Sequence, residues 1–167
     1  GAVANRTKCY EEDGACTELS DGKLTTAGCY KAAEFINFCN AFNIPVLSLT
    51  NVNGYKATVE EEKTVAKAAA KLTYAFANCT VPKVNVIVGS SYGNGYTVMN
   101  SKALGCDMVF AWSGASVGTM PARDAVRIIY DEELKSMSDT AAYLDEKSAE
   151  YEALQNSALS AAKRGYI

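Results

Sequence analysis

Short apolar segments and longer amphipathic segments alternate along this chain. The apolar runs have little polar character of their own, which is typical of strands buried in a parallel sheet. They lie at 45–50, 84–88, 108–112 and 116–119. Apolar residues spaced three and four apart predict helices at 26–42, about 58–78, 122–130, 139–155 and 157–164. This alternation with short connections predicts an α/β domain whose mostly parallel sheet is wrapped by helices.

Three segments permit more detailed predictions. Residues 1–5 should form a strand that enters a polar hairpin or excursion reaching Asp21 and Gly22. Helix 26–42 should be capped by Thr25 or Thr26. Its expected inner positions are Ala32, Phe35, Ile36, Cys39 and Phe42. A single second helix should begin near Thr58 or Val59, with three glutamates in its first turn. Its expected inner positions are Val65, Ala69, Leu72 and Phe76.

Composition and charge limit the classes of partner. The 167 residues are 49% hydrophobic and 21% charged, which fits one globular domain. A net charge of -3 gives no broad basic face, so nucleic acid is not an expected partner. No apolar run approaches the roughly 18 residues of a membrane span, and residues 1–8 do not resemble a secretion signal. We therefore expect a cytoplasmic setting.

Cysteine and histidine usage restricts the available chemistry. The six cysteines never adopt the CxxC spacing of zinc or redox sites, so we expect reduced thiols packed mostly in the core and no metal. They are Cys9, Cys16, Cys29, Cys39, Cys79 and Cys106. The chain contains no histidine, which removes the usual proton shuttle of serine and cysteine hydrolases.

The glycine-rich segment 89–96 is the candidate for chemistry. Gly93-Asn94-Gly95, between an apolar strand and an expected helix start at 97–102, could aim backbone N–H groups at an oxyanion, or could be a tight turn that only packs. Val98 stands where a dinucleotide-binding motif needs its third glycine. Residues 89–93 spell Gly-x-Ser-x-Gly, but Ser91 has no histidine to activate it, so hydrolase chemistry is disfavoured.

Five blocks of the chain resemble, in order, segments of the carboxyltransferase subunits of biotin-dependent acyl-CoA carboxylases and decarboxylases. The blocks read KAAEFINFCNAFNIP at 31–45, GY at 54–55, AKLTYAFANCTVPK at 70–83, SYGNGYTVM at 91–99 and DMVFAW at 107–112. The similarity is densest from Lys31 to Met120 and fades beyond about Tyr130. Five blocks in register are more specific than any one of them.

The resemblance implies the fold and the domain organisation. The expected fold is a crotonase/ClpP-like spiral of β-β-α units with a mostly parallel sheet. Residues 1–167 look like one C-terminal, biotin-side carboxyltransferase domain, with the acyl-CoA-binding N-terminal domain and a final tail lying outside them. The implied partners are that N-terminal domain, a biotin carboxyl carrier on a separate domain or protein, the acyl-CoA substrate and further copies in a homo-oligomer.

The resemblance also implies the reaction and the site. The activity would be carboxyl transfer between carboxybiotin and an acyl-CoA, with the isolated domain inactive. The family's turn that holds the biotin ureido oxygen falls on Gly93-Asn94-Gly95-Tyr96, so the amides of Asn94 and Gly95 would be catalytic. Gly93, Tyr96 and Thr97 would bind the cofactor. Gly54 and Tyr55 correspond to a Pro-Gly-Phe element that could present a facing amide.

Four residues or segments depart from the family pattern, and the acidic position among them bears on substrate choice in some members. Asn53 replaces a proline, Lys56-Ala57-Thr58 replaces Leu-Pro-Gly, Thr97 replaces a frequent acidic residue, and Ser113 replaces a proline after Trp112. The acyl substrate and the direction of the reaction are therefore left open. Two alternatives also stay open: a crotonase-type CoA-ester hydratase or isomerase, and a non-catalytic assembly module of a larger enzyme. A hydratase would need acids over the glycine amides, and the turn 92–99 has none.

Overall fold

The computed structural model describes residues 1–167 except 6, 19–21 and 138. Its main sheet is parallel throughout, which confirms the prediction from the apolar runs. Four strands follow the order β1-β4-β5-β6, and β7 pairs with the end of β5 beyond β6. The strands are β1 (Ala2–Ala4), β4 (Val46–Val52), β5 (Lys83–Tyr92), β6 (Met108–Ala111) and β7 (Ser116–Gly118).

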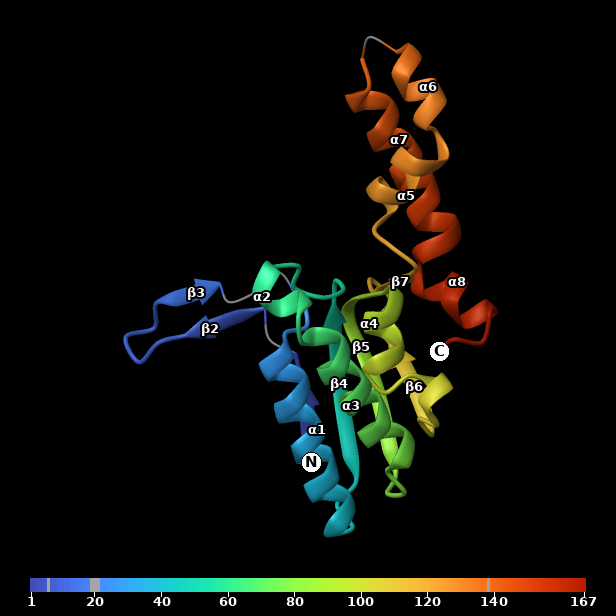
Figure 1. Ribbon diagram of the computed structural model, residues 1–167. Coiled ribbons are helices and arrows are strands. Elements are labelled where there is room, and N and C mark those ends of the chain that lie inside the picture. Colours follow the sequence, from blue (N-terminus) through green and yellow to red (C-terminus); the bar gives the residue numbers. More distant parts are fainter. Residues whose placement is uncertain (6, 19–21, 138) are drawn as a thin grey trace.

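The excursion after β1 is a separate antiparallel hairpin. It consists of β2 (Lys8–Tyr10) and β3 (Cys16–Glu18), and it extends away from the main sheet (Figure 1). This confirms the expected hairpin, although Asp21 and the side chain of Cys9 lie outside the described residues. Gly22 is described, and its carbonyl accepts from Asn53 N at 2.9 Å. The hairpin thus returns the chain beside the loop that follows β4.

Helix α1 (Thr26–Ala41) begins at the predicted cap, where Thr25 Oγ1 accepts from Gly28 N at 3.1 Å. Its inner face is only partly as predicted. Ile36 and Cys39 are buried, but Phe35 is 38% exposed and Phe42 is 65% exposed. The actual inner positions are Cys29, Ala33, Ile36 and Cys39. Small residues at this face permit close packing against α3, so the aromatic rings lie outside.

The single helix predicted for 58–78 is wrong, because two helices occupy this segment. They are α2 (Val59–Glu62), capped by Thr58 as expected, and α3 (Val65–Asn78). The break has a long-range cause: Glu61 Oε2 accepts from Thr26 N at 2.7 Å, and the hydroxyls of Thr26 and Thr64 are 3.0 Å apart. Of the expected inner positions, Ala69, Leu72 and Phe76 are buried and Val65 is partly exposed.

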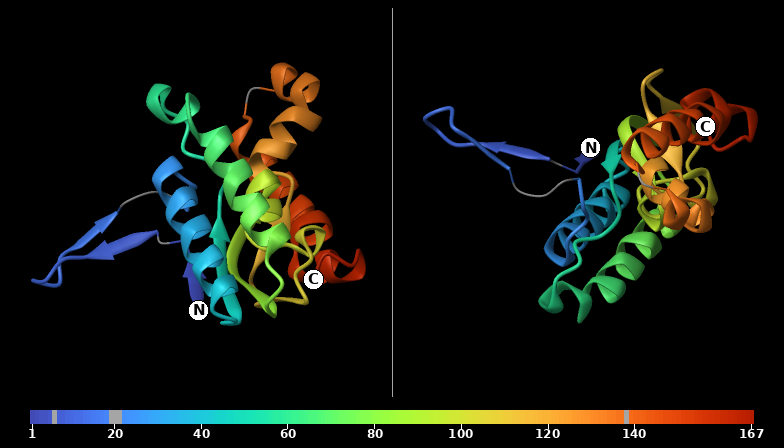
Figure 2. Two further views of the ribbon diagram at one scale, coloured as in Figure 1. Left: turned by 60° about the horizontal axis from the view of Figure 1, so that its bottom comes forward. Right: turned by 90° about the horizontal axis from the view of Figure 1, so that it is seen from above.

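Helices α1 and α3 lie side by side on one face of the sheet (Figure 2). The core between them and the sheet is apolar, with Ile36, Leu72, Phe76 and Met99 each 2% exposed or less. Of the six cysteines, Cys29, Cys39, Cys79 and Cys106 are buried free thiols, and Cys16 is an exposed free thiol. The expected packing of the thiols is therefore confirmed for most of those whose side chains the structure describes.

The last part of the chain, from Ala122 onward, forms a helical arm. Its elements are α5 (Ala122–Ile129), α6 (Asp131–Ser136), α7 (Ala141–Tyr151), the π-helical segment η2 (Glu152–Asn156) and α8 (Ala158–Lys163). α5 and α7 pack together and project from the sheet, whereas α8 returns beside β7 (Figure 1). The three predicted helices in this region are confirmed, while α6 was not predicted.

Candidate functional site

The glycine-rich segment forms a strand end and a helix start instead of an extended turn. β5 runs to Tyr92, four residues beyond the predicted strand, and the short helix α4 (Gly93–Val98) begins at once. A register shift makes this extension possible, because Thr50 pairs with Ile87 whereas Val52 pairs with Ser91. The extra residues in β5 are held by the Asn51 side chain, whose Oδ1 accepts from Ser90 N at 2.9 Å.

The candidate amides lie in the first turn of α4. Gly93 has φ +56°, a left-handed conformation that favours glycine. The N–H groups of a helix's first turn have no intrahelical acceptor. In the described part of the chain, no other acceptor is found for the amides of Asn94 and Gly95. Asn94 is exposed and Gly95 is buried, so these donors lie at the edge between core and solvent.

Gly54, which the family resemblance suggested as the source of a facing amide, lies beside Gly95. A β-carbon on Gly95 would overlap Val52 Cγ1 and would lie 3.5 Å from Gly54 N. Gly54 has φ +94°, and its carbonyl accepts from Leu24 N at 2.9 Å. Among the residues that the structure describes, Gly54 N has no acceptor either. Two glycines 41 positions apart in the sequence thus present unpaired amides in one neighbourhood.

The expected cofactor-binding residues divide between two sides of α4. Gly93, Tyr96 and Thr97 line a cavity of about 460 Å³ between α4, β7 and the C-terminal arm. Gly54 and Tyr55 are not among the residues lining this cavity, nor are Asn94 and Gly95. The first turn of α4, which carries the backbone amides of Asn94 and Gly95, is called the amide turn below. Gly54 lies beside this turn, whereas Tyr96 and Thr97 line a neighbouring surface.

The C-terminal arm closes this cavity, and nothing in the sequence pattern indicated this. Tyr96 donates its hydroxyl to Tyr166 O at 3.0 Å, and the two rings meet edge to face. Lys102 Nζ donates to Gly165 O at 3.1 Å on the same side. Burial raises the pKa of the Tyr96 phenol, with Tyr166 adding to the effect, so Tyr96 stays protonated near neutral pH.

Asn156 of η2 is a second residue that sequence reasoning missed. It is 1% exposed, and its Nδ2 donates to Met120 O at 3.0 Å and to Glu152 Oε2 at 3.3 Å. Its side chain lies against Gly118, where a β-carbon would overlap Oδ1. A β-carbon on Gly93 would in turn lie 3.1 Å from Thr119 O. Asn156 therefore fixes the segment that packs against the start of α4.

Glu152 extends this network toward β5. Ser116 Oγ donates to Glu152 Oε1, and the Tyr92 hydroxyl hydrogen-bonds to Ser116. Burial is the main cause of the raised pKa of Tyr92, and the nearby Glu152 carboxylate adds to it. A π-helical turn such as η2 is uncommon and occurs often at functional sites. A single sequence carries no local signal for this contact, because 36 residues separate Ser116 from Glu152.

The buried side-chain amides of Asn85 and Asn100 hold the C-terminal end of α4. Thr50 Oγ1 donates to Asn85 Oδ1 at 2.8 Å, and Asn85 Nδ2 donates to Met99 O at 3.0 Å. Asn100, with φ +56°, donates to Ser48 Oγ at 3.2 Å. Because buried polar groups need partners, these bonds fix the helix against β4 and β5. The short helix α4 is thus held near both of its ends, and this fixes the position of the amide turn at its start.

The site offers backbone donors and few acid or base side chains. Burial, with a smaller contribution from Cys29, raises the pKa of Tyr55 to about 12, so this phenol can donate a hydrogen bond but is not a base at neutral pH. No group of three His, Cys, Asp or Glu side chains within the described residues could hold a metal ion. The arrangement is suited to stabilising negative charge on an oxygen.

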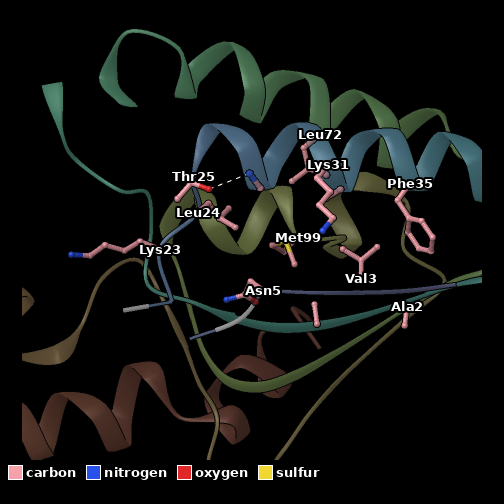
Figure 3. Close-up of a pocket in the computed structure, with 13 residues that line it drawn as sticks. Ala2, Val3, Asn5, Lys23, Leu24, Thr25, Lys31, Phe35, Leu72 and Met99 are labelled. Carbon is pink, nitrogen blue, oxygen red and sulfur yellow. Dashed lines mark hydrogen bonds between the residues drawn. The ribbon is translucent and has the colours of Figure 1, made fainter. Parts of the chain in front are cut away.

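A larger cavity of about 640 Å³ lies away from the predicted site residues. It is bounded by β1 and α1, and Lys31 and Phe35 extend toward it from the helix (Figure 3). Val3 of β1 and Met99, beyond the end of α4, also contribute to its walls. None of the seven residues singled out from the sequence lines this cavity. Its lining is mainly apolar, which is typical of space filled by another apolar group.

The parallel sheet with helices on one face, together with the solved structures that it resembles, places the chain in the crotonase-like class of carboxyltransferase domains. The model of the carboxyl transferase domain family matches residues 1–167 in full. The chain therefore belongs to this family, and the fold and family expected from the five sequence blocks are confirmed.

Related proteins and structures agree with this classification. A protein from Bacillus subtilis named as a putative propionyl-CoA carboxylase beta chain is 43% identical over 131 residues, covering 78% of this chain and 26% of that protein. The methylmalonyl-CoA carboxyltransferase 12S subunit of Propionibacterium freudenreichii is 39% identical over 138 residues, covering 82% and 26%. A crystal structure of transcarboxylase 12S, described as a hexamer assembly, has a TM-score of 0.81 at 38% identity, covering 87% and 28%.

The chain spans between about a quarter and a third of the length of these relatives. In the part of the chain that the structure describes, no helix is long and apolar enough to cross a bilayer.

Proposed function

We propose that this chain is the biotin-side, C-terminal domain of an enzyme that transfers a carboxyl group between biotin and an acyl-CoA. The observation that carries the proposal is that Gly54 N lies close to Gly95 in the first turn of α4, where the amides of Asn94, Gly95 and Gly54 have no acceptor among the described residues. The similarity to propionyl-CoA carboxylase and methylmalonyl-CoA carboxyltransferase subunits supports the reaction class. Biotin, when bound, supplies the ureido group that carries the carboxyl group in transit.

The residues fit a urea-like carbonyl in three respects. The Asn94 and Gly95 amides are adjacent donors without a protein acceptor in the described structure. Gly95 has no β-carbon, so the backbone there can approach Val52 and Gly54 closely. Gly93, Tyr96 and Thr97 line a neighbouring cavity of about 460 Å³, where they could contact the rest of the cofactor.

The role of these residues is positioning and charge stabilisation. Each preorganised amide aimed at an oxygen that gains negative charge contributes about 3 to 4 kcal/mol to catalysis. Tyr55, with its raised pKa, can donate a hydrogen bond beside Gly54. Asn85 donates to Met99 O at the C-terminal end of α4, and Asn156 holds the segment that packs against Gly93, so both residues help to fix where the amides point. No histidine is available as a base, and this arrangement does not require one.

The partners follow from the same proposal. The acyl-CoA would be bound by a separate N-terminal domain, and biotin would arrive on a carrier domain or protein. The hexamer described for transcarboxylase 12S supports assembly of several copies in the full enzyme. Because the chain spans about a quarter to a third of its relatives, we expect residues 1–167 alone to be inactive.

The sharpest test removes one amide without changing the packing. Asn94 is exposed, and proline is tolerated in the first turn of a helix, so Asn94→Pro deletes a donor at little cost to the fold. In the full-length enzyme we expect kcat for carboxyl transfer to propionyl-CoA to fall by about 100-fold or more, with CoA-ester affinity unchanged. Asn94→Ala keeps the N–H and should retain activity.

Two further variants complete this test. Gly95→Pro should abolish carboxyl transfer, since it removes a donor and also displaces Val52. Ser91→Ala, beside the turn, should cost little because its hydroxyl is not a nucleophile in this proposal. Wild-type kcat in Asn94→Pro and Gly95→Pro would refute the amide assignment. Crotonyl-CoA hydration by the full-length enzyme would instead favour a hydratase, and the absence of any turnover would favour an assembly module.

A further inference from the structure

A single side chain joins the two strands that lead to the amide turn. At the register shift between β4 and β5, the two backbones do not pair residue for residue. Asn51 lies at this point of β4, and its Oδ1 accepts from Ser90 N of β5 at 2.9 Å. Its Nδ2 has no partner among the described residues. The acceptor oxygen is therefore the group through which the Asn51 side chain acts.

Asn5, which directly follows β1, fixes the main chain of Asn51 from the other side. Asn51 N donates to Asn5 Oδ1 at 2.9 Å, and Asn5 Nδ2 donates to Asn51 O. The Asn5 side chain thus contacts β4 beyond Ala4, the last residue of β1. Because both main-chain polar groups of Asn51 are bonded, its side chain starts from a fixed position.

Close packing around Gly89 holds the Asn51 side chain in place. A β-carbon on Gly89 would lie 2.5 Å from Asn51 Oδ1 and 2.8 Å from its Cγ. Both distances are far shorter than a normal contact between non-bonded atoms, so any larger residue at position 89 would push the asparagine side chain away. The bond to Ser90 N therefore depends on a glycine at the neighbouring position.

Both approaches to the site begin at the bond between Asn51 and Ser90. From Asn51 the chain continues through Val52 to Gly54, and from Ser90 it continues to the amide turn. The two paths meet again where a β-carbon on Gly95 would overlap Val52 Cγ1 and would lie 3.5 Å from Gly54 N. Because this closed circuit is short, a displacement at its origin should reach both sets of amides.

We propose that Asn51 is a positioning residue of the carboxyltransferase site: its bond to Ser90 sets where the amide of Gly54 lies relative to the amide turn. Asn51 is not among the residues lining the cavity beside α4, so it acts through the backbone and not on a ligand. The inference rests on the proposed function, in which these amides hold the ureido oxygen. Loss of the bond should slow carboxyl transfer without weakening acyl-CoA binding, which is assigned to a separate domain.

Asn40 supplies a matched control at the other end of β5. Its Oδ1 accepts from Thr80 N at 2.9 Å, so this bond has the same kind of donor and acceptor and the same length as the bond from Ser90. The Thr80 hydroxyl also donates to Asn40 Oδ1 at 3.1 Å. Thr80 precedes β5, whereas the amide turn follows it. Asn40→Ala should therefore reduce stability at least as much as Asn51→Ala, but without moving the amides.

The first test measures kcat and KM of the full-length enzyme for carboxyl transfer to propionyl-CoA. Asn51→Ala should lower kcat by about 10- to 100-fold and leave KM for the CoA ester within about twofold, because small displacements of positioned groups have effects of this size. Asn51→Asp keeps an acceptor for Ser90 N and should retain kcat within about threefold of wild type. Gly89→Ala, which displaces the same side chain, should reproduce the defect of Asn51→Ala. Asn40→Ala should lower the urea midpoint of unfolding but not kcat.

The second test does not depend on the reaction. In residues 1–167, the nuclear Overhauser contact between Gly95 and the Val52 methyl groups should weaken in Asn51→Ala and persist in Asn40→Ala. Wild-type kcat in Asn51→Ala would overturn the inference, as would an equal fall of kcat in Asn40→Ala or an unchanged Overhauser contact in Asn51→Ala.

The two tests also separate this inference from the proposed function. If Asn94→Pro abolishes carboxyl transfer and Asn51→Ala does not, the amides are catalytic and the positioning role of Asn51 is wrong. If Asn94→Pro keeps wild-type kcat, the proposed function is wrong, and the role of Asn51 in carboxyl transfer falls with it even where the Overhauser contact weakens. A fall of kcat in both variants, with rescue by Asn51→Asp, supports both.

Discussion

Asn156 and Gly118 are in such close contact that a β-carbon on residue 118 would overlap the amide oxygen of Asn156. The amide cannot move away easily, because its nitrogen donates to Met120 O at 3.0 Å and the side chain is 1% exposed. This contact ties the C-terminal arm to β7, which packs beside the first residue of α4. A small change at Gly118 should therefore alter the position of the amide turn.

We predict that Gly118→Ala lowers the free energy of unfolding by about 1 to 3 kcal/mol, the usual cost of adding a methyl group against a well-packed side chain, here the buried Asn156. Urea unfolding followed by circular dichroism measures this change. Gly114→Ala is the matched control, since a β-carbon there meets nothing within 4 Å, and it should be neutral or slightly stabilising. Equal effects of the two substitutions would show that the Asn156 contact is not the cause.

Gly95 allows a prediction about coupling between two residues. Alanine is normally favoured over glycine in a helix by about 1 kcal/mol, yet a β-carbon on Gly95 would overlap Val52 Cγ1. We expect Gly95→Ala to destabilise the chain by about 1 to 3 kcal/mol. In a Val52→Ala background the same substitution should cost at least about 1 kcal/mol less, because its partner has been removed.

A double-mutant cycle by urea unfolding measures this coupling. Val52 is fully buried, so Val52→Ala has its own cost, and only the non-additive part tests the contact. Additivity of the two changes would mean that the backbone moves to accommodate alanine. In that case the close approach of Gly95 to Gly54 would not be rigid, and the proposed pair of facing amides would lose its support.

The order of the elements, the parallel sheet and the cap of α1 could be predicted because they depend on local patterns. Apolar runs alone were enough to predict strands at 45–50 and 84–88, where the structure has β4 and β5. Thr25 caps α1 by accepting from the amide of Gly28, only three residues away. Phe35 and Phe42 were placed wrongly because α1 has two apolar stripes. Periodicity cannot choose between them, whereas close packing against α3 selects the stripe of small residues.

The errors and omissions at the site share a physical cause, which is contact between distant segments. Glu61 breaks the predicted helix by bonding to Thr26, 35 residues earlier. Asn51 holds the residues of β5 beyond the predicted strand, so α4 begins at Gly93 and not at residue 97 as predicted. From the C-terminal part of the chain, Tyr166 bonds to Tyr96 of α4, and Asn156 packs on Gly118 in the segment beside α4. The family resemblance pointed to the amides as the candidate site, but no local pattern could reveal what supports them.

The stability of the chain should fall at alkaline pH through Cys29. Burial, with a smaller contribution from the Glu61 carboxylate, raises the pKa of this thiol from 9.0 to about 11. The unfolded chain therefore loses its proton first, and the free energy of unfolding should decline as pH rises from 9 toward 11, by at most about 1.4 kcal/mol per pH unit. Below pH 9 this contribution is fully present.

Urea unfolding at several pH values from 7 to 10.5 tests this prediction. Cys29→Ala should flatten the alkaline decline, whereas Cys16→Ala, at an exposed position, should leave its slope unchanged. Burial also raises the pKa values of Cys106, Tyr55, Tyr92 and Tyr96, so these groups should produce the remaining decline. An identical slope in wild type and Cys29→Ala would refute the assignment of this effect to Cys29.

Lys83 should stabilise the end of α3. Its ammonium group is buried, with the residue 5% exposed, and it donates to Phe76 O at 2.8 Å and to Leu104 O at 3.4 Å. A cation at a helix C-terminus interacts favourably with the helix dipole, and bonds from charged donors contribute about 1.5 to 3 kcal/mol. Lys83→Met fills the same space but leaves the Phe76 carbonyl without this donor. We expect it to lower the free energy of unfolding by about 1 to 3 kcal/mol.

Lys67→Met, at an exposed position of the same helix, is the control and should change stability by less than about 0.5 kcal/mol. Hydrogen exchange adds a local readout, because the amides in the last turn of α3 should exchange faster in Lys83→Met than in Lys67→Met. Since Lys83 begins β5, which leads directly to the amide turn, loss of this anchor should also loosen Asn85 and the α4 end that it holds. Unchanged exchange at both places would show that packing of the methylene groups, and not the ammonium, supports this end of the sheet.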